Sequence, residues 1–330
     1  MKLLRLAPEN TKFGFMRFRR MSYPFSATMS IVSVVLFLSL GVNFGIDFAG
    51  GTLMELRAKS GHADIAYVRA TVSKLNIGDV EVQGFGTPSD VLLRFGVQKK
   101  GGATAQESTV SRVKKSLGSK YEFRRVDVVG PRVSSELVQS GTLGVVLAIV
   151  AVLAYLWFRF EWQFAIGAII ATMHDLLLTV GFFSLTRLEF NTTSIAAILT
   201  IVGYSLNETV VVLDRIREMM RKYRRMPTDE LIDISINAVL PRTIMTATTV
   251  FLALLALVTF GGEVIRSFSI AMIWGIFVAT YSSVFICSPM LIYLGLRNES
   301  ADPPQRAAAT KPAKRKAEAD VTETAARSRA

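Results

Sequence analysis

Six long apolar runs constrain the fold of this chain more than any other feature. They cover residues 26–43, 137–158, 164–185, 192–213, 243–260 and 267–294. A helix of about 20 apolar residues is what a hydrocarbon layer of about 30 Å requires. The chain is also 51% hydrophobic, which is too apolar for an ordinary soluble domain. The sequence therefore predicts a membrane bundle of six transmembrane helices, whose last and longest run must tilt or extend past the lipid.

The basic residues predict how these helices are oriented. Six Lys and Arg occur in residues 1–25, six between Asp214 and Arg225, and eight from Arg297 to the end, whereas the short loops 186–191 and 261–266 hold one each. With six spans, the three basic segments lie on one side, and the positive-inside rule assigns that side to the cytoplasm. Both termini are therefore expected in the cytoplasm. The net charge of +12 follows the same pattern, so no nucleic-acid partner is expected.

Residues 44–136 have the pattern of a soluble domain, which this orientation places on the outer, periplasmic side. Alternating or amphipathic segments replace the apolar runs here. Strands are expected at 51–57, 80–83, 91–95 and 121–128, and helices at 64–76 and 104–117. The order βαββαβ predicts a small α+β domain of the ferredoxin-like type.

Composition assigns the remaining segments. Residues 1–25 form a cytoplasmic N-terminus, and the first run is longer than a signal-peptide core, so it is expected to remain as an anchor. Residues 214–242 are expected to form a basic loop and an amphipathic surface helix that has Thr228 as its N-cap and a kink at Pro241. The tail, 295–330, is rich in Ala, Pro, Lys and Arg and is expected to be disordered.

The sequence lacks the short motifs that mark common enzymes. It has no G-x-x-x-x-G-K-[ST] phosphate loop, no H-E-x-x-H, no paired C-x-x-C and no G-x-S-x-G. The single cysteine, Cys287, excludes a disulfide framework, and two histidines, His62 and His174, cannot supply an ordinary set of metal ligands. We therefore expect no enzyme activity, no cofactor and no metal site.

Ionisable side chains inside the apolar runs are the candidate functional residues, because such groups usually face the bundle interior and mark ion or proton paths. Glu208, beside Asn207, is the clearest, since burial is far cheaper for its neutral form than for its anion. Arg242 cannot lose its charge and needs a carboxylate, and Glu208 lies at a similar depth. A pair that loosens when Glu208 is protonated would be a two-state switch. The alternative is a static ion pair that fixes helix packing.

Asp175 and its neighbour His174 form a second candidate within the third run. Adjacent residues lie about 100° apart on a helix, so only one of the two is expected to face the core well. We assign Glu208, Arg242 and Asp175 to a proton path, with Asn207 and His174 in support.

Three separated motifs in this order resemble those of the SecD/SecF family of protein-export membrane subunits. They are NFGIDFAGGT at Asn43–Thr52, GYSLNETVVVLDRIRE at Gly203–Glu218, and PRT-x-x-T-x-T-T at Pro241–Thr249. The resemblance is to the SecF side of the family and covers about residues 15–296. Only the tail falls outside it.

The resemblance implies a translocase subunit of the bacterial inner membrane that is similar in design to exporters of the RND type. Such a subunit forms a complex with SecD and associates with the SecYEG channel, and YajC and YidC are further candidate partners. It uses the proton-motive force to complete the translocation of unfolded preproteins after SecA has inserted them with ATP. In the family, the acid at the position of Glu208 is usually Asp, and this acid and the arginine at Arg242 are implicated in proton conduction.

The glycine-rich motif after the first run also has a physical reading. Gly45, Gly50 and Gly51 allow a tight exit of the chain from the membrane, and Asp47 is expected to anchor the base of the outer domain. A hinge at this point could carry membrane events to the domain.

Two other functions are compatible with the sequence. One is half of a proton-coupled small-molecule exporter of the RND type, although a single outer domain leaves little room for a drug pocket. The other is a scaffold that stabilises the translocation channel without conducting protons.

Overall fold

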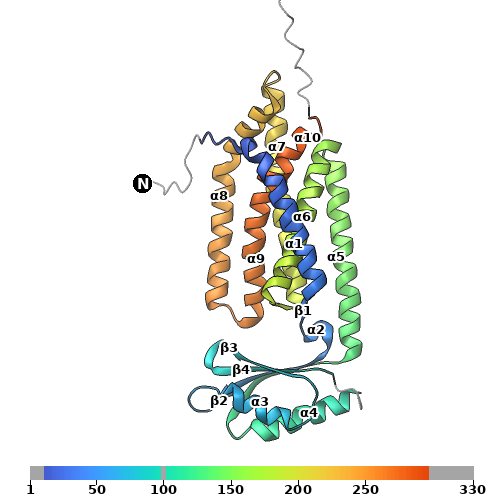
Figure 1. Cartoon of the computed structure of the whole chain (residues 1–330), viewed down its shortest axis with the longest axis vertical. Coiled ribbons are helices and arrows are strands. Elements are labelled where there is room, and N and C mark those ends of the chain that lie inside the picture. Colours follow the sequence, from blue (N-terminus) through green and yellow to red (C-terminus); the bar gives the residue numbers. More distant parts are fainter. Residues whose placement is uncertain (1–10, 98–101, 297–330) are drawn as a thin grey trace, which may run out of the picture.

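The computed structural model describes residues 11–97 and 102–296 and consists of a bundle of long helices with a small sheet domain at one end (Figure 1). Six helices are long and apolar enough to cross a membrane, which confirms the predicted bundle. They are Phe15–Leu40, Pro131–Arg159, Trp162–Thr186, Thr192–Lys222, Thr228–Phe260 and Ile265–Tyr293. The first ten residues and most of the predicted disordered tail lie outside the described residues.

The helices of the bundle extend beyond the apolar runs that predicted them. They are α1 (Arg19–Leu40, after a 3-10 turn at Phe15–Phe18), α5 (Pro131–Arg159), α6 (Trp162–Thr186), α7 (Thr192–Lys222), α8 (Thr228–Phe260), α9 (Glu263–Ser282) and α10 (Ser288–Tyr293). The last span is therefore not one regular helix, because a wider π-helical turn at Ser283–Cys287 joins α9 to α10.

The predicted surface helix is the first part of α8, which continues through Pro241 into the fifth span. In Figure 1 this first part slants away from the direction of the rest of the helix. The N-cap expected at Thr228 was wrong. Pro227 precedes the helix, and the hydroxyl of Thr228 instead donates to the carbonyl of Leu296 at 3.1 Å, which ties the start of α8 to the segment that follows α10.

Helices α6, α7 and α9 form the centre of the bundle. In their most apolar windows 56%, 44% and 61% of residues are buried, against 11%, 6% and 11% for α1, α5 and α8. Small residues allow the helices to approach closely, as is usual in membranes. A Cβ on Gly181 of α6 would lie 2.8 Å from the Cα of Ser33 in α1. The outer three helices therefore expose most of their apolar surface to lipid or to another protein.

The sheet domain has the predicted βαββαβ order. It contains β2 (Gly51–Ala58), α3 (Ile65–Ser73), β3 (Val80–Phe85), β4 (Thr87–Phe95), α4 (Gly102–Leu117) and β5 (Tyr121–Val129). The antiparallel strands are arranged in the order β3-β4-β2-β5, as in a ferredoxin-like fold. Alternate residues such as Met54, Leu56, Leu93 and Phe95 are buried under α3 and α4. The other face of the sheet points to the helical bundle (Figure 1).

Short connections join the sheet domain to the bundle. Strand β1 (Asn43–Phe44) pairs in parallel with β6 (Glu189–Phe190) of the loop between α6 and α7, and α2 (Ile46–Ala49) leads directly into β2. On the return path only Gly130 separates β5 from α5. Neither connection contains a flexible linker.

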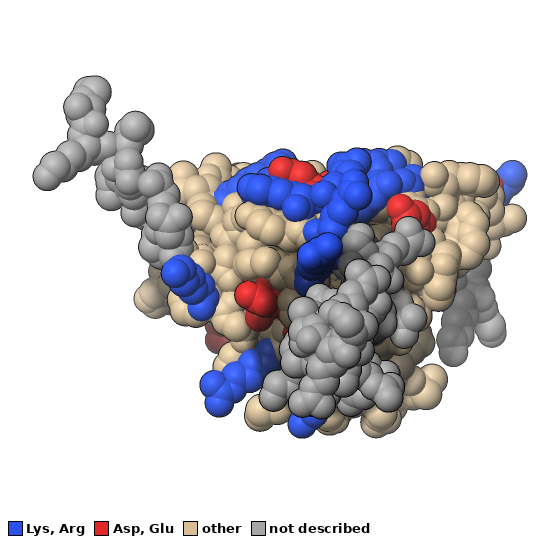
Figure 2. Space-filling view, turned by 90° about the horizontal axis from the view of Figure 1, so that it is seen from above, with Lys and Arg blue, Asp and Glu red and all other residues tan. Residues whose placement is uncertain are grey.

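The far end of the bundle, opposite the sheet domain, is strongly basic. Figure 2 shows Lys and Arg side chains gathered over this end. Four of the basic residues lie close together where α7 ends and the turn to α8 begins, and they line a shallow hollow. They are Arg221, Lys222, Arg224 and Arg225. The charge asymmetry that predicted the orientation is therefore present in the folded molecule.

Candidate functional site

Glu208 lies in the bundle interior, on α7, with only 2% of its surface exposed. Two threonines of α8 hold its carboxylate. The hydroxyl of Thr243 donates to Oε2 at 2.9 Å, and that of Thr246 donates to Oε1 at 3.1 Å. Because Thr243 and Thr246 are three residues apart, they share one face of α8. The PRT-x-x-T spacing carried this information, yet the sequence reasoning did not assign the two threonines to the site.

The predicted ion pair between Glu208 and Arg242 was wrong. Arg242 is exposed, and among the described residues no carboxylate lies within 4.0 Å of its guanidinium. The physical reason is helical geometry, because the position next to Thr243 points about 100° away from it. Asn207, expected in the interior, is exposed for the same reason beside Glu208. Both polar side chains therefore face outward from the bundle.

Asp175 and His174 are both buried in α6, with 1% and 7% of their surfaces exposed. The expectation that only one of them could face the core was wrong, because α6 packs against α1, α7 and α9 together. Ser205 of α7 and Ser282 of α9 donate to Asp175 Oδ2 at 2.5 and 2.8 Å. The Nδ1 atom of His174 lies 3.2 Å from Oδ1. Asp175 thus joins three central helices through hydrogen bonds.

Several buried polar side-chain atoms of α6, α7 and α9 have no hydrogen-bond partner of ordinary geometry within the described part of the chain. They include the Tyr204 hydroxyl, Thr280 Oγ1 and His174 Nε2. Tyr204 points toward Thr246 and Thr280. Unpaired polar atoms in a buried site are where ordered water binds. Hydroxyl and carboxylate groups therefore continue across the bundle from α8 through α7 and α9 to α6.

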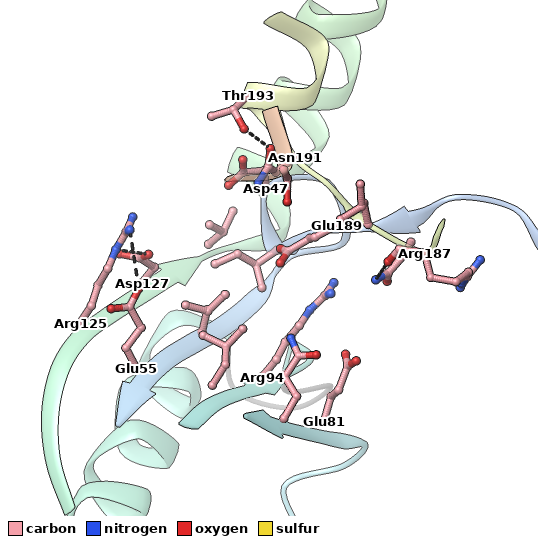
Figure 3. A pocket seen from close by; sticks show the side chains of 18 of the residues that line it. Asp47, Glu55, Glu81, Arg94, Arg125, Asp127, Arg187, Glu189, Asn191 and Thr193 are labelled. Carbon is pink, nitrogen blue, oxygen red and sulfur yellow. Dashed lines mark hydrogen bonds and ion pairs between the residues drawn. The ribbon is translucent and has the colours of Figure 1, made fainter. Parts of the chain in front are cut away.

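A second polar site lies between the sheet and the bundle, as a cleft of about 650 Å³ (Figure 3). Its floor is the open face of the sheet and its roof is the loop between α6 and α7. Five carboxylates and three guanidinium groups line it: Asp47, Glu55, Glu81, Asp127, Glu189, Arg94, Arg125 and Arg187. Burial raises the pKa of Glu189, while the nearby Arg94 opposes this shift. Arg125 pairs with Asp127 at 2.7 Å.

The glycine-rich motif at Asn43–Thr52 contributes to the lining of this cleft. Gly50 and Gly51 have φ values of 70° and 128°, which other residues adopt only with strain. Gly45 has ordinary backbone angles, but a Cβ there would lie 2.5 Å from Glu189 Oε1, so a larger residue would displace the Glu189 carboxylate. Asp47 Oδ2 accepts hydrogen bonds from the backbone nitrogen and hydroxyl of Thr192 at 2.9 and 2.8 Å. Asp47 thus anchors the sheet domain to the start of α7.

No group of three or more His, Cys, Asp or Glu side chains among residues 11–97 and 102–296 is arranged to hold a metal ion. The polar chemistry of both sites therefore rests on carboxylates, hydroxyls, guanidinium groups and one buried imidazole.

Comparisons with known proteins agree on one family. Residues 109–297 match the model "Protein export membrane protein SecD/SecF, C-terminal", and residues 35–61 match the SecD/SecF GG motif. Protein translocase subunit SecF of Rickettsia rickettsii is 45% identical over 295 residues, which cover 87% of this chain and 94% of that protein. Protein translocase subunit SecDF of Brucella abortus is 42% identical over 299 residues, covering 91% of this chain and 39% of that protein.

Solved structures give the same result. The crystal structure of SecDF from Thermus thermophilus, a translocon-associated membrane protein, is 32% identical with a TM-score of 0.77 and covers 87% of this chain and 39% of that one. SecDF in a super-membrane-facing form, also 32% identical, has a TM-score of 0.66 and covers 89% and 40% of the two chains. This chain thus spans well under half of each SecDF chain but nearly all of the Rickettsia SecF. We conclude that it is a multi-pass membrane protein that belongs to the SecD/SecF family, among the SecF-type protein translocase subunits.

Proposed function

We propose that this protein is the proton-coupled partner of SecD in the bacterial inner membrane. The pair would use the proton-motive force to complete preprotein translocation after SecA has inserted the preprotein with ATP. The single observation that supports this proposal is the burial of Glu208 between two threonine hydroxyls, with no ion pair to any described Lys, Arg or His. A carboxylate in such a position is costly when ionised and is by default a functional group.

Protonation of Glu208 changes what it can bond. The ionised carboxylate only accepts hydrogen bonds, so Thr243 and Thr246 both donate to it. The protonated acid has one donor of its own and fits a different arrangement of the same hydroxyls. Helices α7 and α8 would therefore prefer different packing in the two states, which is how proton binding could bias a conformational equilibrium. Asp175 and His174 would continue the path through the bundle.

The exposed polar side chains of α7 and α8 support a partner subunit at this face. Asn207 lies within the fourth apolar run and Arg242 directly precedes the fifth; both side chains face outward, and lipid would offer them no hydrogen bonds. Helices of SecD are the proposed cover, and a SecD carboxylate is the proposed counter-ion for Arg242. The SecYEG channel, YajC, YidC and the unfolded preprotein are proposed as further partners.

The proposed topology has both termini and the basic turn between α7 and α8 in the cytoplasm, with the sheet domain in the periplasm. The basic surface opposite the sheet domain supports this orientation. We propose no enzyme activity for the chain, which would act through proton binding and movement alone.

Translocation into inverted membrane vesicles tests the proposal. We expect Glu208→Gln, which keeps the side-chain shape but cannot titrate, to lose most of the stimulation by a proton gradient while ATP-driven insertion remains. Glu218→Gln is the matched control, because Glu218 lies on the same helix but is exposed. Full gradient stimulation in the Glu208 variant would refute proton coupling and favour a scaffold. If SecYEG did not copurify with this protein, a small-molecule exporter would be favoured instead.

A further inference from the structure

We propose that Asp47 and Glu189 are positioning residues that lock the first turn of α7 to the sheet domain, so that a change at Glu208 is transmitted to the domain through α7. This inference rests on the proposed function of Glu208. It concerns two residues that lie outside the membrane-spanning segments and have no direct contact with Glu208.

Two chain segments far apart in sequence form the lock. Strands β1 and β6 pair, and the backbone nitrogen of Gly45 donates to the carbonyl of Phe190 at 2.8 Å. Arg187 donates to the carbonyls of Leu40 and Gly41 at 2.8 and 3.1 Å. The end of α1 and the loop before α7 are therefore bonded through both backbone and side chains.

The two carboxylates act reciprocally across this junction. Asp47, from the segment after α1, accepts hydrogen bonds from the backbone and hydroxyl of Thr192, the first residue of α7. The carboxylate of Glu189, from the loop before α7, lies close to the backbone of Ile46, the first residue of α2. Each segment thus places a carboxylate at the start of the other segment's helix, where a negative charge is favourable. Gly45 leaves the room that Glu189 needs.

An aromatic cluster packs at the same junction. Phe190 contacts Phe44, Phe48 and Phe183, with ring centroids 6.0, 5.8 and 5.2 Å away. These rings come from β1, α2 and α6, so the cluster spans both segments and the bundle. Figure 3 shows the polar half of the junction, where Asp47, Asn191 and Glu189 gather above the sheet.

Short, regular segments connect this junction to the sheet on one side and to Glu208 on the other. Toward the domain, α2 leads through Gly50 and Gly51 into β2, the strand that pairs with both β4 and β5, and Arg94 of β4 donates to the carbonyl of Phe44. Toward the membrane, α7 runs to Lys222 without a proline. A displacement of α7 at Glu208 must therefore move the loop before it, and with it the sheet.

The variant Asp47→Ala tests whether proton binding at Glu208 can be separated from its transmission to the sheet domain. In proteoliposomes that contain the complex with SecD and SecYEG, we expect Asp47→Ala to keep the Glu208-dependent proton uptake. Gradient-stimulated translocation should fall by about fivefold, the scale of one lost capping interaction. The electron-paramagnetic-resonance distance between spin labels on α3 and α8 should no longer respond to pH. Asp47→Asn, whose amide oxygen can still accept from Thr192, should restore at least half of the stimulation. Asp79→Ala, an exposed acid of the same domain, is the control.

The outcomes separate this inference from the proposed function. Normal stimulation and a normal pH response in Asp47→Ala would overturn the lock, while loss of stimulation in Glu208→Gln would still support proton coupling. If Asp47→Asn were as defective as Asp47→Ala, a role through hydrogen-bond acceptance would be refuted. If Asp47→Ala fails to assemble, Thr192→Ala removes one of the two hydrogen bonds with the carboxylate intact. Unchanged coupling in Thr192→Ala and Glu189→Gln together would also overturn the lock.

Discussion

At the scale of single residues, the structure uses carboxylates in two distinct ways. In the bundle, the carboxylates of Glu208 and Asp175 accept hydrogen bonds from hydroxyl groups of neighbouring helices. In the sheet domain, Asp90 is held by a permanent charge. Nε and Nη2 of Arg57 donate to its two oxygens at 2.6 and 2.7 Å. The first arrangement suits a switch, and the second suits a fixed structural link.

The Arg57 and Asp90 pair leads to a prediction about acid stability. The guanidinium of Arg57 lowers the pKa of Asp90 to about 2, below the ordinary value of about 3.9. The stabilisation is therefore present above pH of about 4 and is lost as pH falls toward about 2. Because the Arg57 side chain is 33% exposed, solvent screening limits the effect of Asp90→Asn at neutral pH to about 1 kcal/mol.

Hydrogen exchange of the β2 and β4 amides, corrected for intrinsic rates, measures this effect. Asp90→Asn should exchange faster than the wild type at pH 7, and this difference should become much smaller near pH 2, where Asp90 of the wild type is partly protonated. Asp79→Asn, which is exposed and unpaired within the described chain, should match the wild type at both values. A difference between Asp90→Asn and wild type that persists unchanged at pH 2 would contradict the pairing.

Single residues also mark how far the site could be predicted. Glu208 and Asp175 could be found from the sequence, because the cost of desolvating a carboxylate makes acidic residues rare in apolar runs. Their partners could not, because serine and threonine are common in membrane helices. Their role depends on which helices touch. The wrong pairing with Arg242 arose because depth in the membrane was known while rotation about the helix axis was not.

At the scale of elements, close helix contacts predict which glycines matter. A Cβ on Gly181 would clash with the Cα and side chain of Ser33, so Gly181→Ala should push α1 away from α6 and cost about 1–3 kcal/mol. Gly144→Ala is the matched control, because nothing lies within 4 Å of a Cβ there. Thermal denaturation of the purified protein in detergent should show a lower midpoint for the first variant only. Equal midpoints would contradict the contact between α1 and α6.

The elements themselves were predictable where the pattern is periodic. Apolar runs set the spans, and alternation set the strands from β2 to β5. The ends were less predictable, because α5, α7 and α8 continue into polar sequence that can be helical outside the lipid as well as inside it. The π-helical turn at Ser283–Cys287 and the two-residue pairing of β1 with β6 depend on contacts between distant segments. No local pattern encodes such contacts.

At the scale of the whole molecule, one face of the bundle is incomplete. The exposed side chains of Arg242 and Asn207 face outward from α8 and α7, and we propose SecD as their cover. Arg242→Leu should therefore reduce the amount of SecD that copurifies in mild detergent by about thirtyfold, the lower end of what an unpaired buried partner charge costs. Met245→Leu, an exposed apolar residue of the same helix, should have no effect. Equal recovery of SecD with both variants would place SecD elsewhere.

The continuity of α7 has one more consequence. Glu208 lies near the middle of this helix, about 24 Å from its first residue and about 21 Å from its last at 1.5 Å per residue. Glu208 thus divides α7 into two parts of nearly equal length. A tilt of about 5° about that point would shift each end by about 2 Å in opposite directions. The sheet domain at one end and the basic turn at the other would then move together, so both sides of the membrane would register a single protonation event.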